Sequence, residues 1–264
     1  MSDYALKLSE AELARYRFMA ELAARMERDL WTAAGVVEGA TVADVGCGPG
    51  AVSAVLAELV GPAGRVLAVD REDEAVAAAR ATASGVANLS VGVGRADDTG
   101  IPPGSVDVVM IRHVLAHNGP RLDAIVSHAA SLVRPGGSVY LADIEGSALR
   151  TRPSDPDFDD LNARYTQWHE RQGNDLSVGL RLGELLAGAG LENVEHHGRY
   201  QIFPVPPGLR PPGWAAREAL VAAGLATEDD VDRWNAAFER LDQVQPRPFM
   251  FTPLFFAFGR RPPG

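Results

Sequence analysis

The segment from residue 41 to residue 50, TVADVGCGPG, constrains the fold more than any other part of the chain. It places an acidic residue, Asp44, inside an apolar stretch typical of a β-strand, and three glycines follow closely, at positions 46, 48 and 50. Glycines let the backbone adopt positive φ angles, and let a ligand come close, where a strand turns into a helix. Because a carboxylate in an apolar strand is costly without a polar partner, we expect this turn to bind a ligand.

The glycine pattern alone leaves the kind of ligand open. Gly46, Gly48 and Ala51 also fit the dinucleotide pattern G-x-G-x-x-A. A pyrophosphate would bind to backbone N–H groups at the helix N-terminus, where Asp44 would repel it and where Pro49 removes one donor. The segment therefore favours a cationic ligand. An ordinary glycine-rich turn without a ligand remains the alternative.

Alternating strand and helix signals surround this turn. We expect strands at about 41–46, 65–70, 89–94, 106–112 and 138–143, with helices between them at about 52–59, 73–84 and 122–133. Glycine and proline, as at 61–62 and 135–137, separate several of these elements. The alternation predicts an α/β fold with a doubly wound parallel sheet, which binds ligands at the carboxyl ends of its strands.

Both ends of this region carry additional elements. Residues 1–35 are expected to form an N-terminal helical cap that starts at a capping box of Ser9 and Glu12 and could pair with a second copy of the chain. Residues 36–264 form the main domain, with helical insertions at about 150–175 and 204–247 and an aromatic last strand at 249–259. The aromatic residues of the insertions either enclose an apolar substrate or form the core of the cap, and the helical spacing of Trp234 and Phe238 favours the core.

Composition narrows the partners and the compartment. A formal net charge of -10 gives no basic surface for a nucleic acid or an anionic membrane. No apolar run approaches the roughly 20 residues of a membrane span, and we see no secretion signal. The single cysteine, Cys47, rules out a disulfide framework within the chain. We therefore expect a cytoplasmic protein that acts on a small molecule.

Acidic residues also follow the next two expected strands. Asp70 ends the strand at 65–70, where its carboxylate can accept hydrogen bonds from both hydroxyls of a ribose. Asp97 or Asp98 follows the strand at 89–94 and could accept from the exocyclic amine of an adenine. These positions fit an adenosine-containing ligand of either cofactor class. Solvated loop aspartates are the alternative interpretation for Asp97 and Asp98.

Taken together, five stretches of the sequence resemble one family. VADVGCGPG, Asp70, RADDTGIPPGSVDVVM, RHVLAHN and LVRPGGSVYLAD, in this order and spacing, resemble the class I S-adenosylmethionine-dependent methyltransferases. The group that includes the ubiquinone/menaquinone C-methyltransferases and small-molecule tailoring enzymes is the most similar. The resemblance covers about residues 36–145. It implies a Rossmann-like, seven-stranded, mostly parallel sheet in the order 3-2-1-4-5-7-6, whose last strand is antiparallel.

The resemblance also implies a cofactor site for S-adenosyl-L-methionine. An acidic residue beside the glycine loop suits the ammonium and sulfonium groups of that cofactor better than it suits a pyrophosphate. By this resemblance, the expected cofactor-binding residues are Asp44, Gly46, Gly48, Gly50, Asp70, Asp97, Asp98 and Arg112.

We expect methyl transfer to oxygen, carbon or nitrogen of a small organic acceptor, in secondary metabolism or quinone-type chemistry. Histidine is the natural general base near neutral pH, and the candidates are His113, His117 and His169. No metal is expected, because only Asp143 and Glu145 follow the strand at 138–143.

Two other function classes remain open. A nicotinamide-dependent oxidoreductase would share the glycines and Asp70, but it leaves Asp44 unexplained. A methyltransferase homologue could also bind the cofactor without transferring a methyl group, as a cyclase-like or regulatory protein.

Overall fold

A central sheet of eight strands organises the chain. The computed structural model describes residues 10–264, apart from the side chains at 11 and 12, so the expected capping box of Ser9 and Glu12 lies outside the described residues. The strands are β1 (Thr41–Val45), β2 (Arg65–Asp70), β3 (Leu89–Val93), β4 (Val106–Arg112), β5 (Val133–Ile144), β6 (Arg150–Arg152), β7 (Glu192–Pro204) and β8 (Phe249–Arg260).

The strand order confirms the expected fold class. The sheet runs β3-β2-β1-β4-β5-β8-β6, and β7 pairs with the other side of β8. Strands β1 to β5 are parallel, whereas β8 runs antiparallel to β5, β6 and β7. The seven longer strands thus follow the order implied by the resemblance. The short β6 was not predicted; it lies beside β8 beyond the end of β5.

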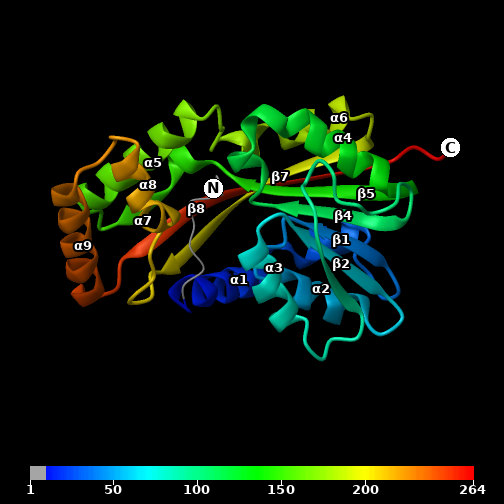
Figure 1. The fold of residues 1–264 in the computed structure, drawn as a ribbon, viewed down its shortest axis with the longest axis horizontal. Coiled ribbons are helices and arrows are strands. Elements are labelled where there is room, and N and C mark those ends of the chain that lie inside the picture. Colours follow the sequence, from blue (N-terminus) through cyan, green and yellow to red (C-terminus); the bar gives the residue numbers. More distant parts are fainter. Residues whose placement is uncertain (1–9) are drawn as a thin grey trace.

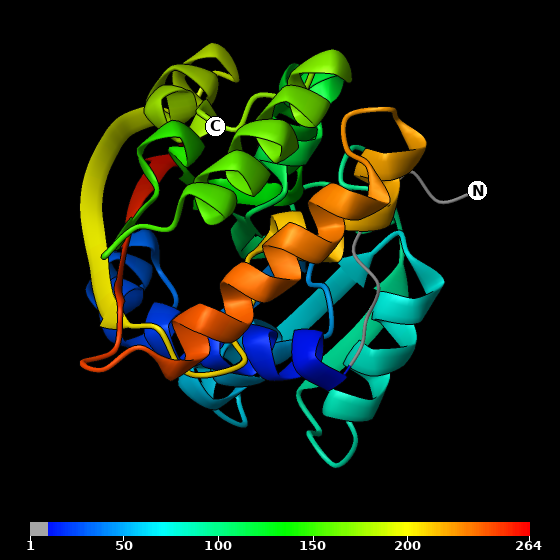
Figure 2. The same cartoon turned by 90° about the vertical axis from the view of Figure 1, so that its left-hand side faces the viewer.

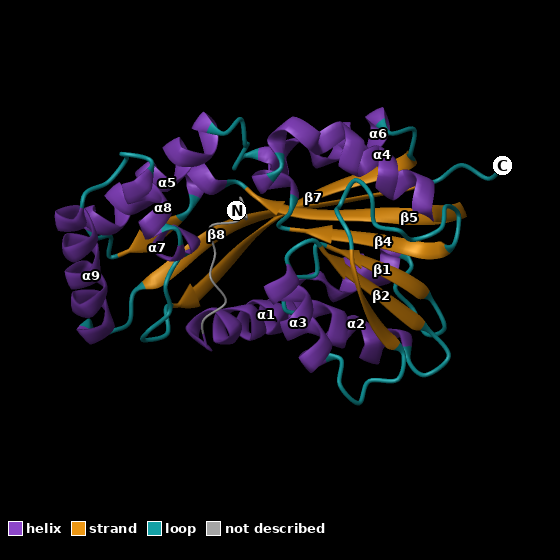
Figure 3. Ribbon diagram, in the orientation of Figure 1, coloured by secondary structure: helices purple, strands orange, loops and turns teal. Residues whose placement is uncertain are grey.

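Helices cover both faces of the sheet (Figures 1 and 3). One face carries α1, α2 and α3, and the other carries α4 and α6. At one end of the molecule, α5, α7, α8 and α9 form a cap. The helices are α1 (Glu10–Ala34), α2 (Ala51–Val60), α3 (Asp73–Thr82), α4 (Leu122–Leu132), α5 (Pro156–Arg171), α6 (Leu182–Gly188), α7 (Pro212–Ala215), α8 (Arg217–Ala222) and α9 (Glu228–Gln243).

The N-terminal helix is part of the main core. Its residues Ala23, Leu30 and Trp31 are buried in one cluster with side chains of α2 and of strands β1, β2, β4, β5 and β8. Burial of an apolar helix face on a sheet is the main source of its stability. The apolar face that suggested pairing with a second copy is therefore used within the chain.

The cap helices lie together at one end of the molecule (Figure 2). Their side chains form a core of their own. Trp234 and Phe238 are buried there with Phe158 and Leu161, so the core interpretation of these two aromatic residues is confirmed. The expected helical insertion at about 204–247 is broken into the separate helices α7, α8 and α9. Helix α9 begins after such a break, at a capping box. The hydroxyl of Thr227 accepts from the backbone N–H of the third helical residue, and the carboxylate of that residue accepts from the backbone N–H of Thr227.

Strands β7 and β8 extend past the parallel strands towards the cap (Figure 3). β8 reaches residues 249–251 beside β6, whereas β5 ends at Ile144, which pairs with Leu254. The extension therefore places residues of β7 and β8 beyond the carboxyl ends of the parallel strands, where this fold class binds ligands. Within the described part of the chain, no helix combines the length and the apolar character that a membrane span requires.

The middle of β8 should carry much of the stability of the sheet. Phe256 is fully buried, 6.5 Å from the ring of Tyr140, whereas Phe249 on the same strand is 44% exposed. We expect Phe256→Ala to lower the free energy of unfolding by about 3 to 5 kcal/mol, because it leaves a cavity in the core. Phe249→Ala, the matched control, should cost about 1 kcal/mol or less. Chemical denaturation measures both, and equal losses would contradict this packing.

Candidate functional site

One cavity of about 730 Å³ lies at the carboxyl ends of the parallel strands. It is lined by the loop after β1, the ends of β2, β4 and β5, the N-terminal part of α1, and the cap. We call the part next to β1 and β2 the cofactor half. The acceptor half is the part lined by α5, residues 209–213, β7 and β8.

Contacts with neighbouring elements help to determine the shape of the glycine loop. Gly46 has φ of 76°, and a Cβ atom there would lie 2.3 Å from Cγ2 of Val114. Gly46 and Gly48 line the cavity as expected. Gly50 does not line it: a Cβ atom there would lie 3.2 Å from Cα of Ala79 on α3. The left-handed backbone of Gly50, at φ of 78°, and its close approach to α3 therefore favour glycine at this position.

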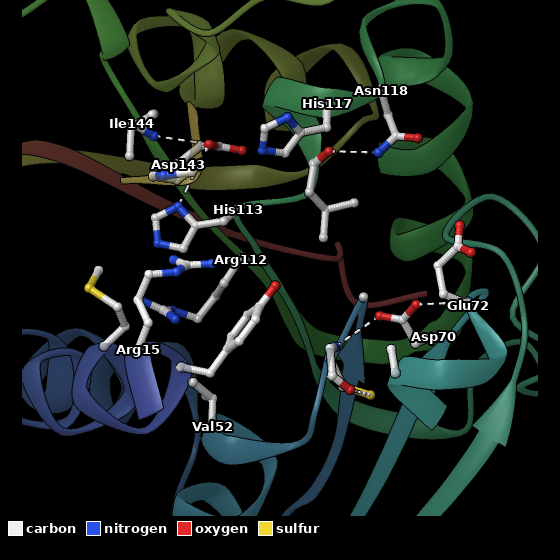
Figure 4. A pocket seen from close by; sticks show the side chains of 18 of the residues that line it. Arg15, Val52, Asp70, Glu72, Arg112, His113, His117, Asn118, Asp143 and Ile144 are labelled. Carbon is white, nitrogen blue, oxygen red and sulfur yellow. Dashed lines mark hydrogen bonds and ion pairs between the residues drawn. The ribbon is translucent and has the colours of Figure 1, made fainter. Parts of the chain in front are cut away.

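Asp70 fixes this loop from the end of β2. Its Oδ2 accepts from the backbone N–H of Gly48 at 2.8 Å, and its Oδ1 accepts from that of Glu72 at 3.1 Å (Figure 4). A carboxylate has about four acceptor positions, so two remain for a ligand. Asp70 lines the cavity, in the position expected of a residue that binds a ribose.

Of the two candidate adenine-binding acids, the structure places only one at the cavity. Asp97 lines it and forms ion pairs with Arg95 and Arg121. Asp98 is exposed and lies outside the cavity lining, because its backbone pairs with that of Arg95 in a tight turn. Asp97 is therefore the acid that can reach a ligand.

Asp44 lies in a cluster of buried charges. It is 3% exposed and accepts a hydrogen bond of 2.6 Å from the hydroxyl of Ser53. Burial raises the pKa of Asp44 to about 6, although the Ser53 hydroxyl and the positive charge of Arg112 oppose this. Arg112 lines the cavity as predicted. Its side chain donates two hydrogen bonds to Glu27 of α1, at 3.1 and 2.5 Å.

Glu27 is a residue that the sequence analysis missed. It is fully buried and also accepts hydrogen bonds from Trp31 Nε1 at 3.1 Å and from the hydroxyl of Tyr140 at 2.9 Å. A signal was available: Glu27 lies on the apolar side of the helix, one turn before Trp31. Arg112 is thus paired with the buried carboxylate of Glu27, and its positive charge also acts on the buried carboxylate of Asp44.

His113 and His117 line the boundary between the two halves, and Asp143 lies behind them (Figure 4). His113 has φ of 54°, and its Nδ1 lies 3.9 Å from Oδ1 of Asp143. Asp143 is buried and also accepts from the backbone N–H of Ala116 at 3.1 Å. Burial lowers the pKa of His117, and the charge of Asp143 opposes this shift. Asp143 thus has a place in the site that its strand-end position alone did not indicate.

His169 lies behind His117 and does not line the cavity. The rings of Tyr165 and Trp168 pack around it. Burial lowers the pKa of His169 to about 3, so its imidazole is neutral. Its Nδ1 lies 3.1 Å from Nδ2 of Asn174. The structure therefore removes His169 from the candidates for a general base, because aromatic packing separates it from the cavity.

Metal ligands do not converge anywhere in residues 10–264: no group of three or more His, Cys, Asp or Glu side chains there is placed to hold an ion. Glu145 accepts hydrogen bonds from Ser147 and Ser177 instead.

Comparisons with known proteins agree with this geometry. Residues 42–137 match a family model described as a methyltransferase domain. Nocamycin O-methyltransferase of Saccharothrix syringae is 40% identical over 105 residues, which are 39% of this chain and 37% of that protein. Arsenite methyltransferase of Aquipseudomonas alcaligenes is 35% identical over 118 residues, 41% of this chain and 34% of that protein. The chain thus spans little more than a third of these relatives.

Solved structures match over a larger part of the chain. One from Bacillus halodurans has a TM-score of 0.57 at 20% identity and covers 90% of this chain and 99% of its own. Phosphoethanolamine N-methyltransferase 2 of Haemonchus contortus, in complex with S-adenosylhomocysteine, has a TM-score of 0.53 at 18% identity, covering 88% of this chain and 52% of that one. These structures share the fold. The chain therefore contains a methyltransferase domain with a Rossmann-like fold, as its sequence predicts.

The burial of Asp44 should make the stability of the ligand-free protein depend on pH. Its pKa of about 6 exceeds the value of 3.8 for an exposed carboxyl, so the folded state holds this proton more tightly than the unfolded state. The resulting stability is complete below the unfolded pKa and is lost as the pH rises to about 6. Asp44→Asn has no proton to lose at this position, so this loss of stability is absent. Between pH 4 and 6.5, the free energy of unfolding of the variant should therefore rise by up to about 3 kcal/mol relative to that of wild type.

Urea unfolding across this pH range measures the difference. Asp98→Asn is the control, because Asp98 is exposed. A constant gap between Asp44→Asn and wild type at every pH would show that Asp44 does not titrate in this way.

Proposed function

We propose that the chain transfers a methyl group from S-adenosyl-L-methionine to a small organic acceptor. The observation that supports this most directly is the buried charge cluster beside the glycine loop, in which Asp44 is buried without an ion-pair partner among residues 10–264 while Arg112 pairs with Glu27. A second cation would offset the remaining buried negative charge. The ammonium and sulfonium of S-adenosylmethionine supply positive charge at this end of the cofactor.

The donor set of the cofactor half fits the rest of the molecule. Asp70 keeps acceptor positions for ribose hydroxyls, and Asp97 lines the cavity where it can accept from the adenine amine. Gly46 and Gly48 have no side chains, so a ligand can approach the backbone. A pyrophosphate, by contrast, would lie beside Asp44 with fewer backbone donors because of Pro49. The acid and the missing backbone donor therefore argue against the nicotinamide-dependent oxidoreductase.

The acceptor half supports group transfer over simple cofactor binding. The same cavity continues past His113 and His117 into a largely apolar compartment under the cap, which can hold a second molecule. The insertions at about 150–175 and 204–247 are proposed to contribute its outer wall. The names of two relatives, nocamycin O-methyltransferase and ubiquinone biosynthesis O-methyltransferase, favour an acceptor from secondary metabolism or quinone-type chemistry.

The residues around the cavity are proposed to act by positioning, water exclusion and proton transfer. The cofactor supplies an activated methyl group on a good leaving group, so orientation of the acceptor contributes much of the rate. His113 directs Nδ1 towards Asp143, which leaves Nε2 to take a proton from a hydroxyl or an acidic carbon of the acceptor. His117 is the second candidate for this base. A cytoplasmic location is part of the proposal, supported by the single, buried thiol of Cys47.

Cofactor binding is the first test. Calorimetric titration at pH 8 should show binding of S-adenosylhomocysteine and S-adenosylmethionine and no binding of NADH. Asp44→Asn should weaken S-adenosylmethionine binding by about 30-fold or more, because about 2 kcal/mol or more is lost when a buried charge loses its partner. Asp98→Asn, which changes an exposed acid outside the cavity lining, should leave the affinity for S-adenosylmethionine within twofold of wild type. Binding of NADH without binding of either sulfur nucleoside would reject the proposal.

Proton transfer is the second test. His113→Asn keeps a residue that tolerates the left-handed backbone but removes the imidazole. With a phenol or hydroxyquinone acceptor found by screening for S-adenosylhomocysteine release, kcat should fall about 10²- to 10⁴-fold, while the Kd for S-adenosylhomocysteine stays within twofold. If His117→Gln causes this loss and His113→Asn does not, the base is His117. If neither variant loses activity, no histidine acts as the base.

A further inference from the structure

The acceptor half of the cavity has almost no net charge. Arg210 is the one charged side chain that α5, residues 209–213, β7 and β8 contribute to its lining. The guanidinium of Arg210 is already neutralised: its Nη2 lies 2.7 Å from Oδ2 of Asp242, and it lies 4.7 Å above the ring of Phe238. A carboxylate, phosphate or ammonium on the acceptor would therefore lose water here without gaining a counter-charge.

The same wall carries hydrogen-bonding groups that lack partners. Thr252 of β8 lines the cavity at 7% exposure, and its hydroxyl has no hydrogen-bond partner among residues 10–264. Gln201 of β7, its register partner, lies behind the lining at 3% exposure and has a buried Oε1 without a partner. Register partners in antiparallel strands project to the same side of the sheet, so the two side chains are neighbours. Buried polar groups without partners are rare and require an explanation.

A half-buried amide on α5 also lines the compartment. Asn162 of α5 lines the cavity, and its side-chain amide has no hydrogen-bond partner in the described part of the chain. Thr166, one turn later, differs: its hydroxyl donates to the backbone carbonyl of Asn162 at 2.9 Å. Helix α5 thus offers the side-chain amide of Asn162 to a ligand, whereas the hydroxyl of Thr166 already has a hydrogen-bond partner.

These groups lie away from the transfer site. Asp143 pairs with Phe255 in the sheet, and Thr252 is further along β8 towards the cap. At about 3.3 Å per residue, Thr252 lies roughly 10 Å along β8 from Phe255, the residue that pairs with Asp143.

We propose that the acceptor is an uncharged, largely apolar molecule that carries a carbonyl or hydroxyl oxygen remote from the methylated atom. The hydroxyl of Thr252 recognises this oxygen by donating a hydrogen bond to it, with the side-chain amide of Asn162 as a second donor, and makes it a determinant of specificity. An acceptor without the oxygen leaves these groups unpaired, and a charged acceptor lacks a counter-ion. The inference rests on the proposed function, because it assigns this compartment to the second substrate.

Three probes with one ring system test the inference: methyl naphthyl ketone, isopropenylnaphthalene and naphthoate, substituted at the same ring carbon. Their binding is measured by calorimetry on the full chain saturated with S-adenosylhomocysteine. We expect the ketone to bind at least about fivefold more tightly than the hydrocarbon and the carboxylate, the effect of one hydrogen bond. Equal or tighter binding of naphthoate overturns the uncharged class, and absence of ketone binding overturns the inference as a whole.

Two isosteric variants locate the recognition site. Thr252→Val should abolish the preference for ketone over hydrocarbon, whereas Thr166→Val, in the same cavity but with a committed hydroxyl, should keep it. Unchanged S-adenosylhomocysteine affinity in both variants shows that they fold. A preference that survives in Thr252→Val overturns the assignment to Thr252. Failure of the wild-type chain to bind S-adenosylhomocysteine is a different result, which rejects the proposed function itself.

Discussion

The buried ion pair of Glu27 and Arg112, whose positive charge also acts on Asp44, is the constraint on which the rest of the site depends. Glu27 attaches α1 to β4 through two hydrogen bonds to Arg112, and this contact lies under the wall that α1 forms over the cofactor half. Removal of one partner from a buried pair is more costly than removal of both, because a lone charge stays buried. The ion pair that joins the N-terminal helix to β4 therefore lies beside Asp44, the acid that favours a cation at the glycine loop.

The two halves of the cavity come from different parts of the chain. The match to the methyltransferase-domain family ends at residue 137 and includes Asp44, Asp70 and His113, which surround the cofactor half. The acceptor half is built from the cap and from the extension of β7 and β8, all beyond that segment. The similarity to relatives therefore supports an inference about the cofactor. Specificity for the acceptor must be inferred from residues such as Thr252, which the family match does not cover.

Local patterns were sufficient to predict most of the fold. Glycine and proline punctuate the strands and helices of residues 41–144, and the buried strands are continuous apolar runs, so their order could be derived from the sequence. Long-range contacts could not be derived. Nothing near Gly50 indicates Ala79 of α3, and nothing near His169 indicates the aromatic rings that enclose it. Glu27 likewise acquires its role only from Arg112, which lies 85 positions away in the sequence.

The left-handed backbone of His113 shows how the two halves are joined. A non-glycine residue at positive φ is held there by its surroundings, and such residues concentrate at functional sites. The next residue, Val114, occupies the space that a side chain at Gly46 would need. The sharp turn at His113 therefore seats Val114 on the glycine loop and leaves the imidazole at the cavity beside Asp143. A side chain at position 46 would displace this turn, so the glycine proposed to admit the cofactor also sets the position of the proposed base.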